Sequence, residues 1–349
     1  MATKREERLF EKEMQKIRKA RYEKMKAEGI ENYLTPEQIR YNKNKKVIGA
    51  VWPIFRFLII FGLGFVILYP IIFMLSTAFR PYEQMNDPSI IWLPKSFTLQ
   101  NMQETFDIMS FDTTVLNTVR LNLIASVLQV ITCSITGYGF ARFNFKGKSI
   151  LFGIVIAMIL VPPQIITIPM YLQYAFFDLF GLIPLFNGGE TITLINSGWT
   201  MYLPAMFANG IRAGLFILIF RQFFRGLPKE LEDAAYLDGC GPFKTYIKVM
   251  VPNAKTSFLT VFLFSIVWYW NDYYVSSSFF TRNDTVALML KNLDSELTSR
   301  LFNNQTPGIR AMIVWLESGC LLTIAPILIM YIFLQRYFIE GIERSGLVG

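Results

Sequence analysis

Long apolar runs constrain the fold of this chain more than any other feature. Two examples are FLIIFGLGFVILYPIIFMLSTAF at 57–79 and FLTVFLFSIVWYWNDYYVSSSFF at 258–280. A helix needs about 20 mostly apolar residues to cross the hydrocarbon core of a bilayer. Charged residues make up only 17% of the chain, whereas a soluble domain contains about 25%. The sequence therefore predicts an all-α membrane protein that crosses the bilayer several times.

Six membrane spans are predicted, and the basic residues between them indicate their orientation. Short cytoplasmic loops carry an excess of Lys and Arg. Positions 139–148 and 225–255 contain three and five such residues, whereas 80–113 contains two and 176–203 none. The loop 279–310 departs from this pattern, with four. We expect both termini and segment 225–255 in the cytoplasm. The predicted spans lie at about 54–79, 114–138, 149–175, 204–224, 253–278 and 311–334.

The first 50 residues differ in composition from the rest of the chain. They are hydrophilic, with 14 basic and 8 acidic residues, and predict a charged cytoplasmic extension, helical or disordered, before a six-span membrane domain at 51–349. A solvated helix is favoured there over a membrane-surface or partner-binding helix. No cleavable signal peptide is expected, because the first apolar run begins only after this segment. The net charge of +8 reflects this tail and the cytoplasmic bias, so no nucleic-acid partner is predicted.

Several classes of catalytic site are excluded by residues that the chain lacks. Histidine is absent, which removes His-based triads, zinc sites and proton relays. Cys133, Cys240 and Cys320 are scattered, so neither a disulfide framework nor a metal cluster is implied. The GKS at 147–149 lacks the first glycine of a nucleotide-binding loop, because position 142 is Arg. No catalytic residue and no metal ligand is predicted.

A charged segment, ELEDAAYLDGCGPFKTYIKVMVP at 230–252, separates two of the apolar runs. Carboxylates fall in the first turn of a predicted helix, where the positive end of the helix dipole favours anions. Gly239 suits the left-handed conformation that closes a helix, and Pro242 suits the start of a second short helix. Two adjacent alanines give a small, flat side that a partner can approach closely. The predicted docking residues are Glu230, Asp233, Ala234, Ala235, Asp238, Gly239 and Pro242.

The same segment resembles the coupling motif of permease subunits of binding-protein-dependent ABC importers. That motif reads Glu-Ala-Ala, three residues, Gly, nine residues, Ile, one residue and Leu-Pro. The chain keeps every spacing, with Asp233 in place of the glutamate and valines in place of the two later aliphatic residues. Four further segments resemble the carbohydrate branch, that of maltose-type permeases: RQFFRGLPKEL (221–231), VWYWNDYY (267–274), LVPPQIITIPMYL (160–172) and LQRYFIEGI (334–342).

The resemblance implies a type I ABC importer permease fold and a division of labour among several chains. This chain would pair with a second permease subunit, as a heterodimer, in a bacterial cytoplasmic membrane. Its coupling helix at 229–250 would dock on one of two cytoplasmic ATPase copies, which bind ATP and Mg²⁺, so that this chain needs no cofactor of its own. An extracytoplasmic binding protein would deliver a sugar, which we expect to be an oligosaccharide.

Polar and aromatic residues in the third and fifth predicted spans suggest a path for the solute. Two consecutive prolines at 162–163 break the third span, and the freed backbone groups must be satisfied in a protein-lined cavity. Aromatic faces with amide and carboxylate groups suit a sugar, although aromatic residues also gather at bilayer interfaces and an amide can simply join two helices. The predicted pathway residues are Pro163, Gln164, Trp268, Trp270, Asn271 and Asp272.

Two other transport classes remain open at this point. An importer permease for a non-sugar solute would share the coupling motif, but the carbohydrate-type segments argue against it. An ion-coupled secondary transporter usually places ionisable residues deep in the membrane. Here Arg56, Arg120, Arg212 and Glu317 fall near the ends of predicted spans, which disfavours that class. A membrane-embedded enzyme is disfavoured because no nucleophile has an adjacent base.

Overall fold

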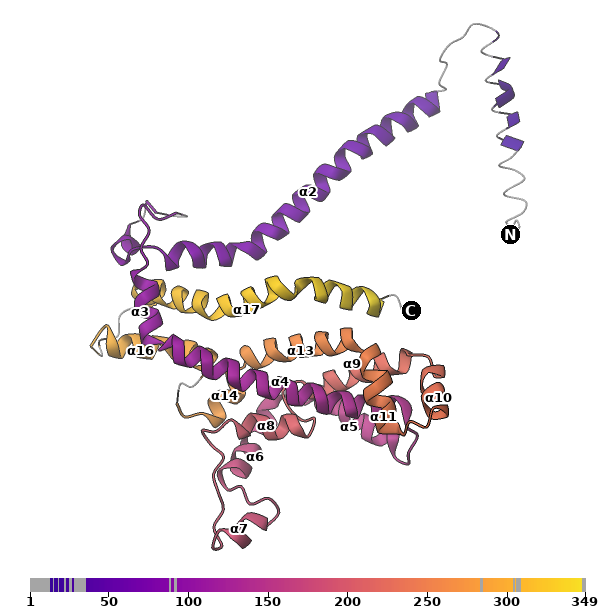
Figure 1. The fold of residues 1–349 in the computed structure, drawn as a ribbon. Coiled ribbons are helices and arrows are strands. Elements are labelled where there is room, and N and C mark those ends of the chain that lie inside the picture. The colour runs from indigo at the N-terminus through magenta and orange to yellow at the C-terminus, as the bar shows by residue number, and fades with distance from the viewer. Residues whose placement is uncertain are drawn as a thin grey trace. The chain divides into compact units, whose positions relative to one another are not determined.

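The computed structural model (Figure 1) describes residues 36–346 except 88, 91–92, 283–284, 304 and 306–308, together with scattered positions between 13 and 27. Within these residues the regular structure is helical, and β pairing is limited to one antiparallel bridge between Phe177 and Ile192. The chain divides into two units, 1–71 and 72–349. Much of the predicted charged extension, including residues 1–12, lies outside the described residues, so its character stays a prediction.

The first unit contains most of α2 (Pro36–Ala78), a continuous helix that begins inside the predicted extension and includes the first predicted span. Pro53 and Pro70 lie within it. Its apolar side chains between Val51 and Ile71 are exposed around the whole circumference. A helix that is apolar all round is stable only where lipid or another protein covers it, as expected for a membrane span.

The second unit holds the remaining elements. After the 3₁₀ turn η1 (Tyr82–Asn86) come α3 (Gln100–Ile108), α4 (Phe111–Arg142), α5 (Lys148–Leu160), α6 (Pro163–Ala175), α7 (Leu182–Phe186), α8 (Trp199–Met206), α9 (Ala213–Gly226), α10 (Glu230–Leu237), α11 (Pro242–Thr245), the π-helical turn η2 (Tyr246–Met250), α12 (Val251–Asn253), α13 (Lys255–Trp270), α14 (Tyr274–Phe279), α15 (Val286–Lys291), α16 (Leu293–Arg300) and α17 (Ile309–Gly346). Helix α4 packs against α8, α9 and α13.

The core of the second unit lies between α4 and α9. Phe216, Phe220 and Phe224 are four residues apart, so they share one face of α9, and all three are fully buried. Gly137 of α4 permits the contact, because a Cβ atom there would lie 2.6 Å from the Cβ of Phe220. The two helices therefore approach backbone to backbone, and α9 is fixed against the C-terminal half of α4.

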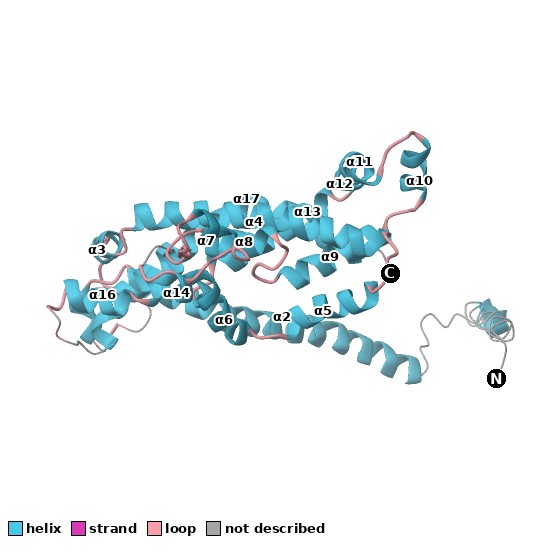
Figure 2. Ribbon diagram, turned by 90° about the horizontal axis from the view of Figure 1, so that it is seen from below, coloured by secondary structure: helices cyan, strands magenta, loops and turns pink. Residues whose placement is uncertain are grey.

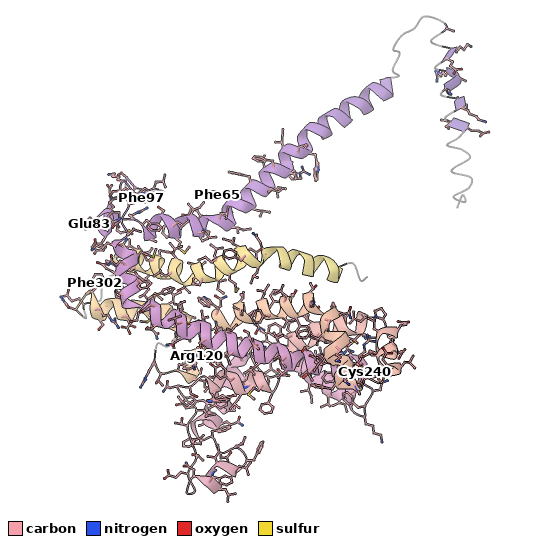
Figure 3. All side chains as sticks on the ribbon, in the orientation of Figure 1. Phe65, Glu83, Phe97, Arg120, Cys240 and Phe302 are labelled. Carbon is pink, nitrogen blue, oxygen red and sulfur yellow. The ribbon has the colours of Figure 1, made fainter. Side chains whose placement is uncertain are left out.

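Segments that the sequence assigns to opposite sides of the membrane lie at opposite ends of α4. Helices α3 and α16 lie near its N-terminal end, and α10 and α11 lie near its C-terminal end (Figures 1 and 2). Among the labelled side chains, Glu83 and Phe302 lie at the first end and Cys240 at the other (Figure 3). The predicted topology requires this separation. Which end faces the cytoplasm stays a prediction.

Helix length and composition reproduce part of the predicted span count. Three helices are long and apolar enough to cross a membrane, namely Val51–Ala78, Phe111–Arg142 and Met312–Gln335, and they match the first, second and sixth predicted spans. The third coincides with the helix pair α5 and α6, which is bent by 101° at Val161–Pro162, and the fifth falls on α13, the second helix of a pair bent by 81° at Ala254. The fourth falls on α8 and α9, which are interrupted at 207–212. By length and composition the described residues contain up to five spans, so the count of six stays a prediction.

Candidate functional site

The segment with the coupling motif folds as two short helices joined by a tight turn. Gly239 has a φ of +77°, its N–H donates to the Tyr236 carbonyl at 3.0 Å, and the Cys240 N–H donates to the Ala235 carbonyl at 2.9 Å. This pair of bonds closes α10 in a Schellman motif, in which glycine is the preferred residue. Pro242 begins α11. The structure confirms both helix-boundary predictions.

Helix α10 has one buried face and one exposed face. Glu232 and Ala235 are three residues apart and both are buried, at 7% and 6% exposure. Of the two adjacent alanines, only Ala234 therefore lies on the exposed surface, which corrects the expectation that the pair forms one flat docking side. Neighbouring positions on a helix differ by about 100° in direction, so the two methyl groups face different ways. The other predicted docking residues, Glu230, Asp233, Asp238, Gly239 and Pro242, are exposed.

Apolar side chains cover the outer surface of this segment. Leu237 is 89% exposed and Phe243 is 69% exposed, with Tyr236 and Ile247 also open to solvent. A shallow groove beside them is lined by residues from Gly241 to Lys248. We call this surface, formed by Tyr236, Leu237, Phe243 and Ile247, the apolar tip. Large exposed apolar side chains such as these suit contact with another protein or with a membrane.

The inner face of α10 is anchored to α4 by a buried ion pair. Arg142 Nε lies 3.2 Å from Glu232 Oε2, and the two side chains are 6% and 9% exposed. The Tyr138 hydroxyl donates to Glu232 Oε1 at 2.8 Å, and Arg142 Nη2 donates to the Leu227 carbonyl at 2.7 Å. The Tyr138 ring also packs on Tyr246, with centroids 5.1 Å apart. The segment is thus joined rigidly to the end of α4.

Sequence reasoning does not single out this anchor. From the sequence, Arg142 is only one of the basic residues that mark a cytoplasmic loop, and Glu232 is only a carboxylate in the first turn of a helix. The available signal is spacing, since Glu232 and Ala235 share a helix face. A carboxylate on the same helix face as a small apolar residue is a candidate for burial, whereas Asp233 is turned about 100° away from it.

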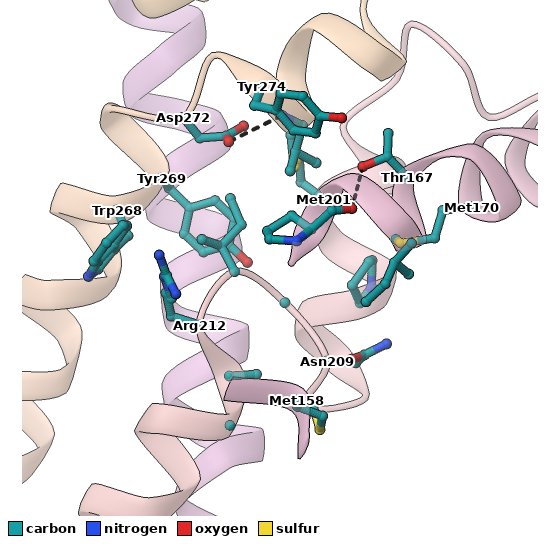
Figure 4. A pocket seen from close by; sticks show the side chains of 18 of the residues that line it. Met158, Thr167, Met170, Met201, Asn209, Arg212, Trp268, Tyr269, Asp272 and Tyr274 are labelled. Atoms are coloured by element: carbon teal, nitrogen blue, oxygen red, sulfur yellow. Dashed lines mark hydrogen bonds between the residues drawn. The ribbon is translucent and has the colours of Figure 1, made fainter. Parts of the chain in front are cut away.

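A cavity of about 550 Å³ lies where several helices end or break. It is lined by α5 and α6 on either side of the Val161–Pro162 break, by α8, by the 207–212 connection, and by the residues from the end of α13 into α14 (Figure 4). Five of the six predicted pathway residues line it, namely Pro163, Gln164, Trp268, Asn271 and Asp272. The structure brings these residues of the third and fifth predicted spans together.

Trp270 lies elsewhere, which corrects its assignment to this group. It is 4% exposed, packs in the cluster that includes Trp315, and donates its indole N–H to the Thr323 carbonyl of α17 at 3.1 Å. Residues two apart on a helix point about 200° away from each other. Trp268 and Trp270 therefore cannot both face the cavity, and only Trp268 does.

Two of the predicted polar residues have local structural partners. Asp272 accepts hydrogen bonds from the Val275 N–H at 3.2 Å and from the Ser276 N–H at 2.9 Å, and its Oδ2 also bonds the Ser276 hydroxyl at 3.1 Å. It therefore caps α14. Asn271 donates through Nδ2 to the Val267 carbonyl at 3.0 Å. Both side chains still line the cavity, but both carboxylate oxygens of Asp272 already accept hydrogen bonds from these donors.

The position of Arg212 in the structure differs from the position that the sequence predicts. Hydropathy puts it near the end of a span, yet it lies in the break between α8 and α9 and lines the cavity. Its guanidinium carbon lies 4.4 Å from the centroid of the Trp268 ring (Figure 4). Asn209 and Gly210 precede it, and Asn-Gly pairs commonly mark turns. That turn signal could have identified the break.

The described residues offer no metal site, since no group of three or more Cys, Asp or Glu side chains among them is placed to hold an ion. The coupling segment and the cavity differ in character. The first is an exposed surface with a rigid base, and the second is a mostly apolar recess with a few polar side chains on its wall.

Comparison with known proteins relates the chain as a whole to transport proteins. Residues 129–344 match the family described as "Binding-protein-dependent transport system inner membrane component". The arabinooligosaccharides transport system permease protein AraQ of Halalkalibacterium halodurans is 29% identical over 303 residues, covering 85% of this chain and 98% of its own length. The trehalose transport system permease protein SugB of Mycobacterium tuberculosis is 25% identical, covering 81% and 93%.

A solved structure shares the fold. It is a bacterial ABC transporter involved in the import of the acidic polysaccharide alginate, and its matching chain superposes with a TM-score of 0.62 over 88% of this chain and 100% of its own length. The sequence identity is 17%, so the likeness concerns the fold alone.

Proposed function

Because the chain belongs to the family of binding-protein-dependent transport system inner membrane components, we propose that it passes an oligosaccharide from an extracytoplasmic binding protein into the cytoplasm. It is a multi-pass carbohydrate ABC-importer permease and not an enzyme, as its relatives are transport permeases. ATP and Mg²⁺ are bound by separate ATPase chains in this proposal. The sugars named for the relatives differ among themselves, so they do not fix the solute.

The proposed assembly contains this chain, a second permease subunit, two ATPase copies and the binding protein. The chain spans a bacterial cytoplasmic membrane six times, with both termini in the cytoplasm. The exposed apolar circumference of α2 between Val51 and Ile71 supports contact with lipid or with the second permease. The bent pair α5–α6 supplies the third span of this arrangement, the α8–α9 pair supplies the fourth and α13 supplies the fifth, while α11 and α12 belong to the cytoplasmic docking segment.

The observation that carries the proposal is the structure of the coupling segment. The apolar tip is exposed, with Leu237 at 89%, while the opposite face of α10 is anchored by the Arg142–Glu232 ion pair. A docking helix that transmits force needs both properties, a surface for the partner and a rigid attachment. We propose that the tip docks on the ATPase and that α10 and α4 move as one body.

Simple energetics show why a rigid attachment matters. Changing a two-state transporter from about 1:99 to about 99:1 between orientations requires about 5.5 kcal/mol of differential binding. If the segment were attached by loops alone, its movement would be absorbed by rearrangement of those loops and would not reach the membrane spans. The ion pair and the Tyr138–Glu232 hydrogen bond instead connect α10 to a helix of 32 residues, and Arg142 also holds the connection before α10 through the Leu227 carbonyl.

The cavity beside the broken helices is the proposed solute path. It combines an exposed aromatic ring at Trp268 with the amide side chains of Gln164 and Asn209. Sugars offer apolar ring faces and many hydroxyl groups, so such a lining suits them. Its volume of about 550 Å³ is within the usual range for a small-molecule site.

Charge reversal on the exposed face of α10 tests the docking proposal. Asp233→Lys is expected to reduce the amount of ATPase that co-purifies with the chain about tenfold. In this proposal the carboxylate of Asp233 is attracted to a basic groove on the ATPase, and a lysine at the same position would be repelled by it. Glu190→Lys, an exposed position in the predicted outer loop, makes the same charge change and should retain the ATPase. If both variants retain the same amount of ATPase, the charge of Asp233 does not contribute to docking.

A further inference from the structure

Arg212 places a positive charge on the wall of the cavity. It lies in the interruption of the fourth predicted span, between α8 and α9. Ionisable residues within the membrane part of a protein are costly and usually serve a function. Among the residues that the structure describes, no carboxylate forms an ion pair with Arg212. The charge is therefore available to a ligand.

The surroundings of Arg212 hold it in a defined position. Its guanidinium lies over the Trp268 ring at 4.4 Å, and the backbone before it is fixed because Gln129 Nε2 donates to the Ile211 carbonyl at 2.6 Å. Gln129 in turn accepts from the buried Tyr269 hydroxyl. An aromatic ring attracts the charge of a guanidinium through its face, and this contact leaves the hydrogen-bonding capacity of the guanidinium N–H groups to a ligand. The arginine is thus preorganised rather than mobile.

The other charged group of the cavity does not neutralise this arginine. Asp272 lines the same space, but its carboxylate already accepts hydrogen bonds from the start of α14. Gln164 and Asn209 are neutral. The cavity therefore presents a guanidinium that has no ion-pair partner among the described residues, a carboxylate whose oxygens are hydrogen-bonded to the start of α14, neutral amides and an aromatic ring. The guanidinium, amides and ring complement a sugar that carries an anionic group.

We infer that this cavity takes an acidic sugar, whose carboxylate pairs with Arg212 during passage. This inference rests on the proposed sugar-importer function and adds the chemical class of the solute. A planar guanidinium can bind a carboxylate through two parallel N–H···O bonds, which a neutral hydroxymethyl group at the same sugar carbon cannot reproduce. The aromatic ring and the amides would hold the remainder of the sugar.

Paired solutes test this inference in cells that carry the complete importer and its binding protein. Each labelled gluco-, galacto- and manno-disaccharide is offered as the neutral sugar and as its 6-carboxylate, with and without this chain. We expect chain-dependent import of at least one carboxylate, and Arg212→Gln should lower the ratio of acidic to neutral uptake about tenfold or more. Arg212→Lys should recover part of the ratio.

Arg221→Gln is the matched control, because Arg221 also lies over an aromatic ring, Phe152 at 3.9 Å, but does not line the cavity. It should leave the ratio unchanged even if total uptake falls. Import of neutral sugars alone, or an unchanged ratio in Arg212→Gln, overturns the inference while the sugar-importer function stands. If neither series is imported in a chain-dependent way, the sugar function fails and the inference fails with it.

Discussion

Replacing Glu232 with alanine is expected to lower the free energy of unfolding of this permease by about 3–5 kcal/mol, the usual cost of breaking a buried ion pair from one side. The substitution leaves the Arg142 guanidinium, 6% exposed, without its carboxylate. It also removes the acceptor of the Tyr138 hydroxyl. The loss should be measured as denaturant-induced unfolding of the complex in mild detergent.

Two further variants distinguish the stability lost by breaking the ion pair from the stability lost by any substitution in this helix. Asp233→Ala removes the neighbouring but exposed carboxylate and should change stability by less than about 0.5 kcal/mol. The double variant Glu232→Leu with Arg142→Leu should be more stable than either single variant, because it leaves no unpaired buried charge. Additive losses in the double variant, or a stable Glu232→Ala, would show that the pair does not anchor α10.

Gly239→Leu is expected to leave the chain inserted and assembled but to reduce solute uptake about tenfold or more. A leucine at a φ of +77° costs about 1–2 kcal/mol of conformational free energy. Each 1.4 kcal/mol changes an equilibrium constant about tenfold. The turn at 238–241 would relax to relieve this cost, so Leu237 and Phe243 would lose their relative placement in the apolar tip. Uptake per inserted chain is the quantity to measure.

Gly241→Leu provides the control for this effect. At both glycines the space that a Cβ atom would occupy is open, with no other part of the protein within 4 Å, but Gly241 has a φ of −76°, which any residue adopts. The two variants therefore add the same side chain to the same turn and differ in backbone strain. Normal uptake with Gly239→Leu would mean that the Schellman closure of α10 is not needed for coupling.

The sequence predicted those parts of the fold that depend on local composition. Apolar runs located three long helices, and Pro162–Pro163 correctly marked a break in the third predicted span, where α5 and α6 meet at 101°. The fourth predicted span was not a single helix, because Ala208 and Arg212 take left-handed conformations between α8 and α9. A window average of hydropathy does not detect such a break, because the residues in the break are themselves mostly apolar.

The role of a site residue could be predicted from the sequence where it depends on that residue's own backbone conformation. It could not be predicted where it depends on a partner far away in the chain. Gly239 and Pro242 have roles set by backbone geometry, so their positions in the motif sufficed. The direction of Trp270 depends on Thr323, which lies 53 residues away in the chain, and the burial of Glu232 depends on Arg142, 90 positions earlier in the numbering. Such partners are known only once the helices are packed.

The central claim, that this chain couples a separate ATPase to solute import, is tested most directly by purifying it from its native membrane in mild detergent and reconstituting what co-purifies. The account predicts recovery of a second permease, an ATPase and a solute-binding protein, and sugar uptake into vesicles only when ATP is present on the ATPase side. Recovery of this chain alone, with solute uptake that needs no ATP, would contradict it and would identify a secondary transporter instead.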